Sequence, residues 1–115
     1  MIEYGYRERL PIPAVLGTSA TLECICSEEK CSKDTTQFYW KRNGTIVNET
    51  LNIRLSREVL SSGLKIALMI LNVSRADEGD FFCKVSNSLG FEERRRTLKI
   101  LAKGWFYESL FVGIF

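Results

Sequence analysis

The sequence predicts an all-β protein, because short runs of alternating apolar and polar residues are separated by turn-forming residues. In the clearest run, Phe81, Cys83 and Val85 share one parity, and side chains of one parity lie on one side of a strand. The run before it has four apolar residues of one parity, Leu64, Ile66, Leu68 and Ile70. The segment 74–79 between the runs contains Asp and Gly, so the two strands are joined by a turn.

The other elements follow in order along the chain. Residues 1–8 are polar and are expected to form a flexible lead-in. Pro11 and Pro13 confine the next segment to a sheet edge, because proline cannot donate a ladder hydrogen bond. Asn43-Gly44 is typical of a tight hairpin turn. The strands are expected at residues 20–26, 37–42, 45–47, 53–59, 64–71, 80–86 and 92–101.

Two cysteines and a tryptophan lie on the inward sides of separate strands. Cys24 and Cys83 flank Trp40 in the sequence, and an Asp-x-Gly-x-Phe segment at 77–81 leads into Cys83. This pattern resembles the immunoglobulin superfamily over about residues 9–101. The resemblance implies a two-sheet antiparallel immunoglobulin-like β-sandwich with Greek-key connections, of the I-set or a V/I-intermediate type. It also implies a Cys24–Cys83 disulfide with Trp40 packed against it.

The same resemblance assigns roles to several further residues. Asp77 and Gly79 match the family's fold motif, and Phe81 stands where the family has a tyrosine, so that hydroxyl's hydrogen bond is absent. An arginine pairs with this aspartate in relatives, so Arg54 or Arg57 is expected to pair with Asp77. The core is expected to contain Leu22, Trp40, Leu68, Ile70 and Phe81.

Size and composition restrict the function. A chain of 115 residues forms one domain with a core of its own. A net charge of +2 gives no strong field for nucleic acid. The chain has no histidine, and it contains no nucleophile, phosphate-binding or metal-spaced motif. We therefore expect neither an enzyme nor a bound cofactor or metal.

Two further cysteines lie close together in the sequence. Cys26 ends a strand and Cys31 follows in a polar loop, and such a loop can bring two cysteines within bridging distance. An intramolecular Cys26–Cys31 bridge is therefore expected, with a free or intermolecular Cys31 in a covalent dimer as the alternative.

Three Asn-x-Ser/Thr triplets begin at Asn43, Asn48 and Asn72 and are candidate N-glycosylation sites. The alternative for Asn43 is a plain turn residue. Together with four cysteines, these sites indicate an oxidising, extracellular or cell-surface location. No apolar signal-peptide segment follows Met1, so we interpret Met1 as a start placed after removal of a leader.

Parity also predicts a candidate partner face on the sheet formed by strands 37–42, 80–86 and 92–101. Its outward residues are Tyr39, Lys41, Phe82, Lys84, Arg95 and Thr97. Aromatic residues beside cations are typical of interfaces, and this sheet commonly mediates homophilic or heterophilic contacts in the superfamily. The alternative is a solvated sheet whose aromatic residues cover one another.

Two segments outside this pattern carry their own predictions. The charge run 92–96 favours a solvated edge strand, with an anionic partner as the alternative. The apolar tail 102–115 is too short to span a bilayer, and its aromatic residues resemble the start of a truncated membrane anchor. An additional pairing strand and non-native sequence are the competing interpretations of the tail.

These observations favour an extracellular recognition or adhesion domain of a cell-surface receptor, secreted or part of a type I membrane protein, that binds a protein ligand or co-receptor or forms a homodimer. An accessory or structural domain of a membrane-protein complex is the alternative. A third interpretation, an intracellular muscle-type I-set domain, requires free thiols.

Overall fold

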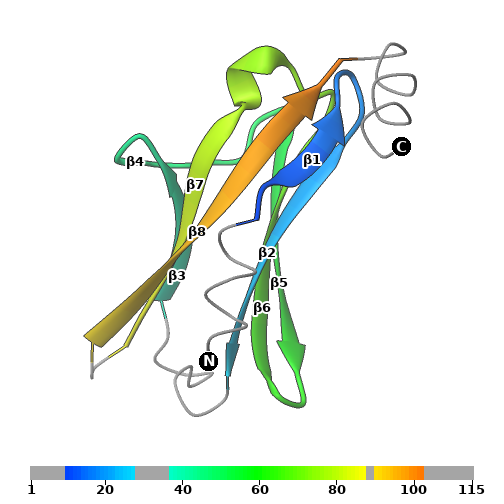
Figure 1. Cartoon of the computed structure of the whole chain (residues 1–115). Coiled ribbons are helices and arrows are strands. Elements are labelled where there is room, and N and C mark those ends of the chain that lie inside the picture. The colour runs from blue at the N-terminus through cyan, green and yellow to red at the C-terminus, as the bar shows by residue number, and fades with distance from the viewer. Residues whose placement is uncertain (1–9, 28–36, 88–89, 103–115) are drawn as a thin grey trace.

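A computed structural model of the chain describes residues 10–27, 37–87 and 90–102 (Figure 1). Most of these residues lie in strands. The elements are β1 (Ile12–Val15), β2 (Ala20–Ser27), β3 (Gln37–Arg42), β4 (Thr45–Ile46), β5 (Ile53–Leu60), β6 (Gly63–Ile70), the 3-10 helix η1 (Arg75–Asp77), β7 (Gly79–Asn87) and β8 (Gly90–Leu101). The expected lead-in 1–8 lies outside the described residues, as does the tail beyond Ala102.

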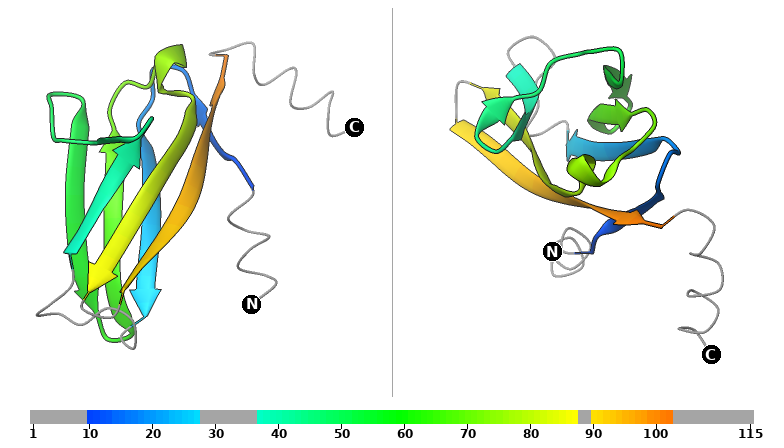
Figure 2. Two further views of the ribbon diagram at one scale, coloured as in Figure 1. Left: turned by 90° about the vertical axis from the view of Figure 1, so that its left-hand side faces the viewer. Right: turned by 90° about the horizontal axis from the view of Figure 1, so that it is seen from above.

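The strands form two layers, as the sequence predicts. One sheet has the order β1-β8-β7-β3-β4, and the other has the order β2-β6-β5 (Figures 1 and 2). All pairs are antiparallel except β1 with β8, which run parallel. The predicted two-sheet immunoglobulin-like sandwich is therefore confirmed, with one parallel pair at this edge. The chain leaves β1 for the opposite sheet, so β1 pairs only with the final strand, at the edge position that its prolines allow.

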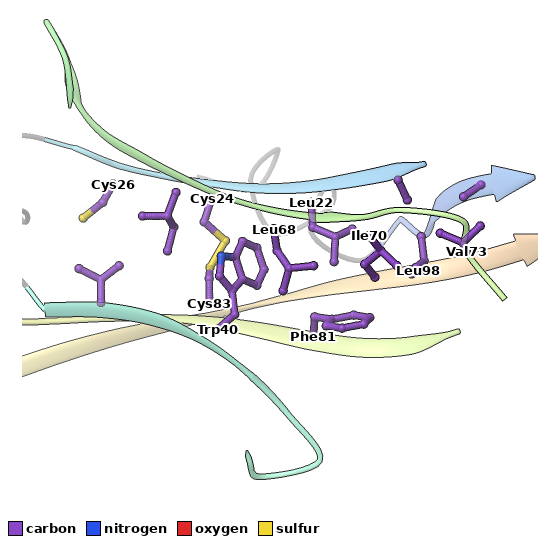
Figure 3. Close-up of a cluster of buried hydrophobic side chains, with 14 of the residues drawn as sticks. Leu22, Cys24, Cys26, Trp40, Leu68, Ile70, Val73, Phe81, Cys83 and Leu98 are labelled. Carbon is purple, nitrogen blue, oxygen red and sulfur yellow. A yellow bond between two sulfur atoms is a disulfide. The ribbon is translucent and has the colours of Figure 1, made fainter. Parts of the chain in front are cut away.

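The core lies between the sheets around a disulfide. Cys24 on β2 is bonded to Cys83 on β7, with their Cα atoms 6.6 Å apart. The Trp40 ring packs beside this bond and is 2% exposed (Figure 3). Its buried Nε1 has no hydrogen-bond partner among the described residues, so packing holds the ring in place. The other expected core residues are buried too: Leu22, Leu68, Ile70 and Phe81.

Turn chemistry fixes the ends of the strands. Asn43 and Gly44 have φ of 51° and 77°, which defines the tight turn that the Asn-Gly pair predicts. Gly79 begins β7 with φ of 139°, a conformation that other residues rarely adopt. The Asp77 carboxylate accepts a 2.7 Å hydrogen bond from the Ser74 backbone N–H. Asp77 therefore closes the turn that places η1 before β7.

Arg42, at the end of β3, is the ionic partner of Asp77. Its guanidinium donates to the carbonyls of Ala76 (2.6 Å) and Glu78 (2.9 Å) and lies 4.0 Å from the Asp77 carboxylate. It also lies 4.7 Å from the centroid of the Phe81 ring. The expected pairing of Asp77 with Arg54 or Arg57 is therefore wrong. Because β3 ends beside η1, Arg42 occupies the position next to the Asp77 carboxylate.

Replacing Arg42 with glutamine is expected to lower the free energy of unfolding by about 2 kcal/mol, because charge-assisted hydrogen bonds to two carbonyls are lost. Urea unfolding of Arg42→Gln measures this loss. Lys41→Gln, one residue away on the outer side of β3, is the control and should shift stability by less than about 0.5 kcal/mol. Equal effects of the two substitutions would contradict this role of Arg42.

Glu78 links the η1 turn to β8. Its carboxylate accepts a 3.0 Å hydrogen bond from the Ile100 backbone N–H and lies 3.5 Å from Lys99 Nζ. The Ile100 hydrogen bond, with help from Lys99 and against a smaller opposing effect of burial, lowers the pKa of Glu78 below its usual value. The folded state therefore binds a proton at this carboxylate less readily than the unfolded chain does.

This shift makes part of the stability pH-dependent. The contribution of Glu78 is fully present above the pKa of an unfolded glutamate, about 4.3, and is lost as the pH falls through the lower folded pKa. Glu78→Gln is expected to flatten this acid limb in unfolding curves measured between about pH 5 and pH 2. An unchanged slope would show that the Ile100 hydrogen bond does not couple to folding.

Candidate partner-binding face

The strand register places the six predicted face residues on one side of the larger sheet. Lys41 lies opposite Phe82, which lies opposite Arg95. Tyr39 lies opposite Lys84 in the next row. Directly opposed residues of antiparallel strands point to the same side, and these positions alternate with the buried residues of the same strands. We call this surface the β3–β7–β8 face: Tyr39, Lys41, Phe82, Lys84, Arg95 and Thr97, with two further residues.

The two further residues were not predicted. Ile46 on β4 lies opposite Lys41 and is 50% exposed. Phe91 on β8 lies opposite Ser86 and is 64% exposed. The Lys84 ammonium stands 4.2 Å from the centre of the Phe91 ring. Phe91 shares its parity with Arg95, so extending the alternation toward the preceding hairpin would have found it; the expected strand began at residue 92, two residues after β8 begins.

Charge distinguishes this face from the outer side of the smaller sheet. There, Lys65 pairs with Glu58 (3.1 Å) and Glu23 (3.7 Å), and the hydrogen bond with Glu58, reinforced by Glu23, raises the pKa of Lys65. On the β3–β7–β8 face, neither Lys41 nor Arg95 has a carboxylate partner among the described residues. These two cations are therefore available to an external anionic group.

One polar contact orders the upper end of the face. Thr97 donates a 2.6 Å hydrogen bond to Asp80 on the neighbouring strand. Its hydroxyl is therefore already engaged within the sheet. We expect Thr97 to shape the face through its methyl group and position rather than as a free donor.

The charge run 92–96 divides between the two sides of β8. Arg96 donates to the Glu23 carbonyl (2.8 Å) and Arg94 to the Ile25 carbonyl (3.5 Å), both on β2. These guanidinium groups close the gap between the sheets along the outer edge of β2. Arg94 also pairs with Glu92 (3.5 Å), as expected for a run whose acids offset its arginines, and Arg95 points to the opposite side.

The candidate glycosylation residues Asn43, Asn48 and Asn72 are all exposed. Asn43 lies in the β3–β4 turn and Asn72 precedes η1, and these turns are joined by Arg42. Both sites therefore lie at the end of the sandwich opposite the β7–β8 hairpin (Figure 1). Asn48 follows β4 at the open side.

The second predicted bridge is only partly described. Cys26 is buried near the end of β2, and Cys31 lies outside the described residues. In the part of the chain that the structure describes, no group of His, Cys, Asp or Glu is arranged to hold a metal ion. No helix within those same residues is long and apolar enough to cross a membrane.

The two disulfide-linked sheets define a β-sandwich domain of the immunoglobulin class, and comparison with known families agrees. The sequence matches the immunoglobulin domain family over residues 12–96, so the chain belongs to this family. On this family membership and the relatives below, the chain is not an enzyme.

Two curated relatives match most of the chain. The chain is 32% identical over 82 residues to V-set and immunoglobulin domain-containing protein 10 of Danio rerio, covering 70% of this chain and 14% of that protein. It is 29% identical over 87 residues to cell adhesion molecule Dscam2 of Drosophila melanogaster, covering 73% of this chain and 4% of that protein. The chain therefore spans a small part of the length of the relatives it matches.

Solved structures share the fold. One is Dpr2 Ig1–Ig2, solved in complex with DIP-Theta Ig1–Ig3, with a TM-score of 0.69, 24% identity, and coverage of 78% of this chain and 29% of that one. Another is a tandem of titin immunoglobulin domains, with a TM-score of 0.68, 17% identity, and coverage of 86% and 47%. At these identities the likeness establishes the sandwich fold.

Proposed function

We propose that the chain is an extracellular recognition domain of a cell-surface receptor or adhesion protein, which binds a protein partner through the β3–β7–β8 face. The observation that carries this proposal is the composition of that face. Half-buried Tyr39 and Phe82 lie beside exposed Phe91 and Ile46. Lys41 and Arg95 on the same face have no carboxylate partner among the described residues, while Glu93 lies opposite Lys84. Aromatic residues with adjacent cations favour the centre of a protein interface.

The relatives support a binding role. Dscam2 is a cell adhesion molecule, and the Dpr2 domains are solved in complex with another set of immunoglobulin domains. A second immunoglobulin domain, from a different protein or a second copy, is therefore the partner class that we favour. An acidic group beside an apolar patch on that partner would complement Lys41 and Arg95.

The cell-surface location rests on chemistry. The Cys24–Cys83 disulfide persists in an oxidising compartment, and the three candidate glycosylation sites are exposed. Sugars at Asn43 and Asn72 would cover the end that carries η1 and leave the lower β3–β7–β8 face open. The apolar tail supports attachment to a membrane as part of the same proposal.

Titin-like architecture favours a second candidate. The titin neighbours are consistent with a structural immunoglobulin domain, whether in an intracellular filament or as an accessory domain beside a membrane segment. Such a domain would not need to bind a partner through the β3–β7–β8 face. The redox state of the cysteines separates the intracellular version of this candidate from the recognition domain.

The face is tested with the substitutions Tyr39→Ala and Phe82→Ala. Tetramers of each variant are applied to cells that display a library of surface immunoglobulin proteins, and binding is measured. Analytical ultracentrifugation of the free chain measures self-association. Each substitution is expected to weaken binding about 30-fold, as for interface residues that contribute about 2 kcal/mol. Met69→Ala, on the outer side of the smaller sheet and 37% exposed, should leave binding unchanged. Retained binding by both face variants would contradict the proposal.

A further inference from the structure

A groove opens between the two sheets on the side where β4 ends after two residues. In the left view of Figure 2, β4 and β5 border this side and the segment joining them crosses its upper part. The groove has a volume of about 340 Å³, within the range of about 300–1,000 Å³ typical of small-molecule sites. Its walls come from both sheets, chiefly Phe38 and Val47 on one side and Leu55 on the other.

A charged residue lies at the mouth of this largely apolar groove, with its side chain exposed. Arg57 on β5 lies opposite the core residue Ile66, so it occupies the inner side of its strand. Its guanidinium lies 5.1 Å from the centroid of the Phe38 ring on the other sheet. Stacking uses the flat face of a guanidinium and leaves its in-plane N–H donors available.

Those donors have no partner among the described residues. Among the described residues, Arg57 makes the contact with Phe38 but no ion pair and no side-chain hydrogen bond. A planar fork of donors at the edge of an apolar groove complements a carboxylate that carries an apolar body. Apolar surface alone would not favour a carboxylate over a neutral apolar ligand. The Arg57 guanidinium at the mouth of the groove does.

The upper end of the groove is closed to a long partner. The Leu55 backbone N–H donates to the Glu49 carboxylate (2.9 Å), and the Ile53 N–H donates to the Thr50 hydroxyl (3.1 Å). These side chains occupy the free edge of β5 where an added peptide strand would have to pair. The Glu49 charge also repels an anion from this end, so the ligand carboxylate would face Arg57 at the open end.

We propose that this groove binds a small amphipathic monocarboxylate of the medium-chain fatty acid type, with its carboxylate on the Arg57 guanidinium and its apolar body between Phe38, Val47 and Leu55. This site borders the β3–β7–β8 face, with which it shares Tyr39 and Ile46, and its ligand contacts are expected on the other residues of the groove. A bound ligand would fill the open side of the sandwich between β4 and β5.

The test is an NMR titration of the isotope-labelled chain with decanoate below its micelle concentration. Saturable shifts are expected at the Arg57 side-chain N–H and the Val47 and Leu55 methyl groups. Arg57→Gln is expected to weaken decanoate binding about tenfold or more, since it removes a charge-assisted pair. Arg54→Gln, on the outer side of the same strand, should leave it unchanged.

Two further measurements complete the test. Leu55→Trp should fill the groove and abolish binding, and an amide spectrum like that of the unchanged chain would show that this variant folds. Decyltrimethylammonium has the opposite charge and should bind at least tenfold more weakly than decanoate. The proposal is overturned if decanoate does not bind, if Arg57→Gln binds it as tightly as the unchanged chain, or if both amphiphiles bind equally.

Discussion

Replacing Cys24 and Cys83 together by alanine is expected to lower the free energy of unfolding by about 4 kcal/mol, because their bond closes a loop of about 60 residues and restricts the unfolded chain. This disulfide links the two sheets and joins residues that are 59 positions apart in the sequence. A domain of this size has a total stability of about 5–15 kcal/mol. The double variant is therefore expected to be marginally folded or unfolded at physiological temperature.

Urea unfolding monitored by circular dichroism measures this loss. The matched control is the double variant Cys26→Ala/Cys31→Ala, whose predicted bridge closes a loop of about five residues and should contribute about 2 kcal/mol on the same argument. A Cys24/Cys83 loss no larger than that of the control would contradict the loop-length explanation.

Phe81→Ala is expected to cost about 3–5 kcal/mol, the usual range for removing a buried phenylalanine. Phe81 is 1% exposed and lies under the Arg42 guanidinium. Its substitution leaves a cavity in the core and removes the surface on which Arg42 packs. Both effects reduce stability in the same direction.

The neighbouring residue provides the control. Phe82 has the same side chain, but it points to the outer side of β7, so Phe82→Ala is expected to cost less than about 1 kcal/mol. Urea unfolding of the two variants under one set of conditions compares them directly. Similar losses would mean that β7 does not alternate between core and surface as the register requires.

The sequence predicts the strands and the core well because a strand has a period of two. Alternation at Leu22, Leu68, Ile70 and Phe81 identifies residues that the structure buries. The parallel pairing of β1 was missed, because local sequence does not specify which edge a short proline-bearing strand joins. The partner of Asp77 was missed for a related reason, since it depends on where β3 ends in space.

The candidate sites also divide into one that local alternation predicts and one that depends on how the sheets are placed in space. Parity predicts which residues share the β3–β7–β8 face, because one sheet with regular register contains them all. The groove beside Arg57 could not be predicted, since it depends on the distance between two sheets where β4 is short. The sequence suggests Arg57 only as a partner of Asp77, whereas the pairing of β5 with β6 places it on the inner side of its strand.

The redox state of the cysteines in the native protein tests the central claim, a disulfide-linked domain that works outside the cell. Free thiols are alkylated at the moment of cell lysis, and linked peptides are then mapped by mass spectrometry without reduction. We expect Cys24 linked to Cys83, Cys26 linked to Cys31, and no alkylated cysteine. Alkylated Cys24 and Cys83 in the folded native protein would contradict the extracellular assignment and favour the intracellular structural domain.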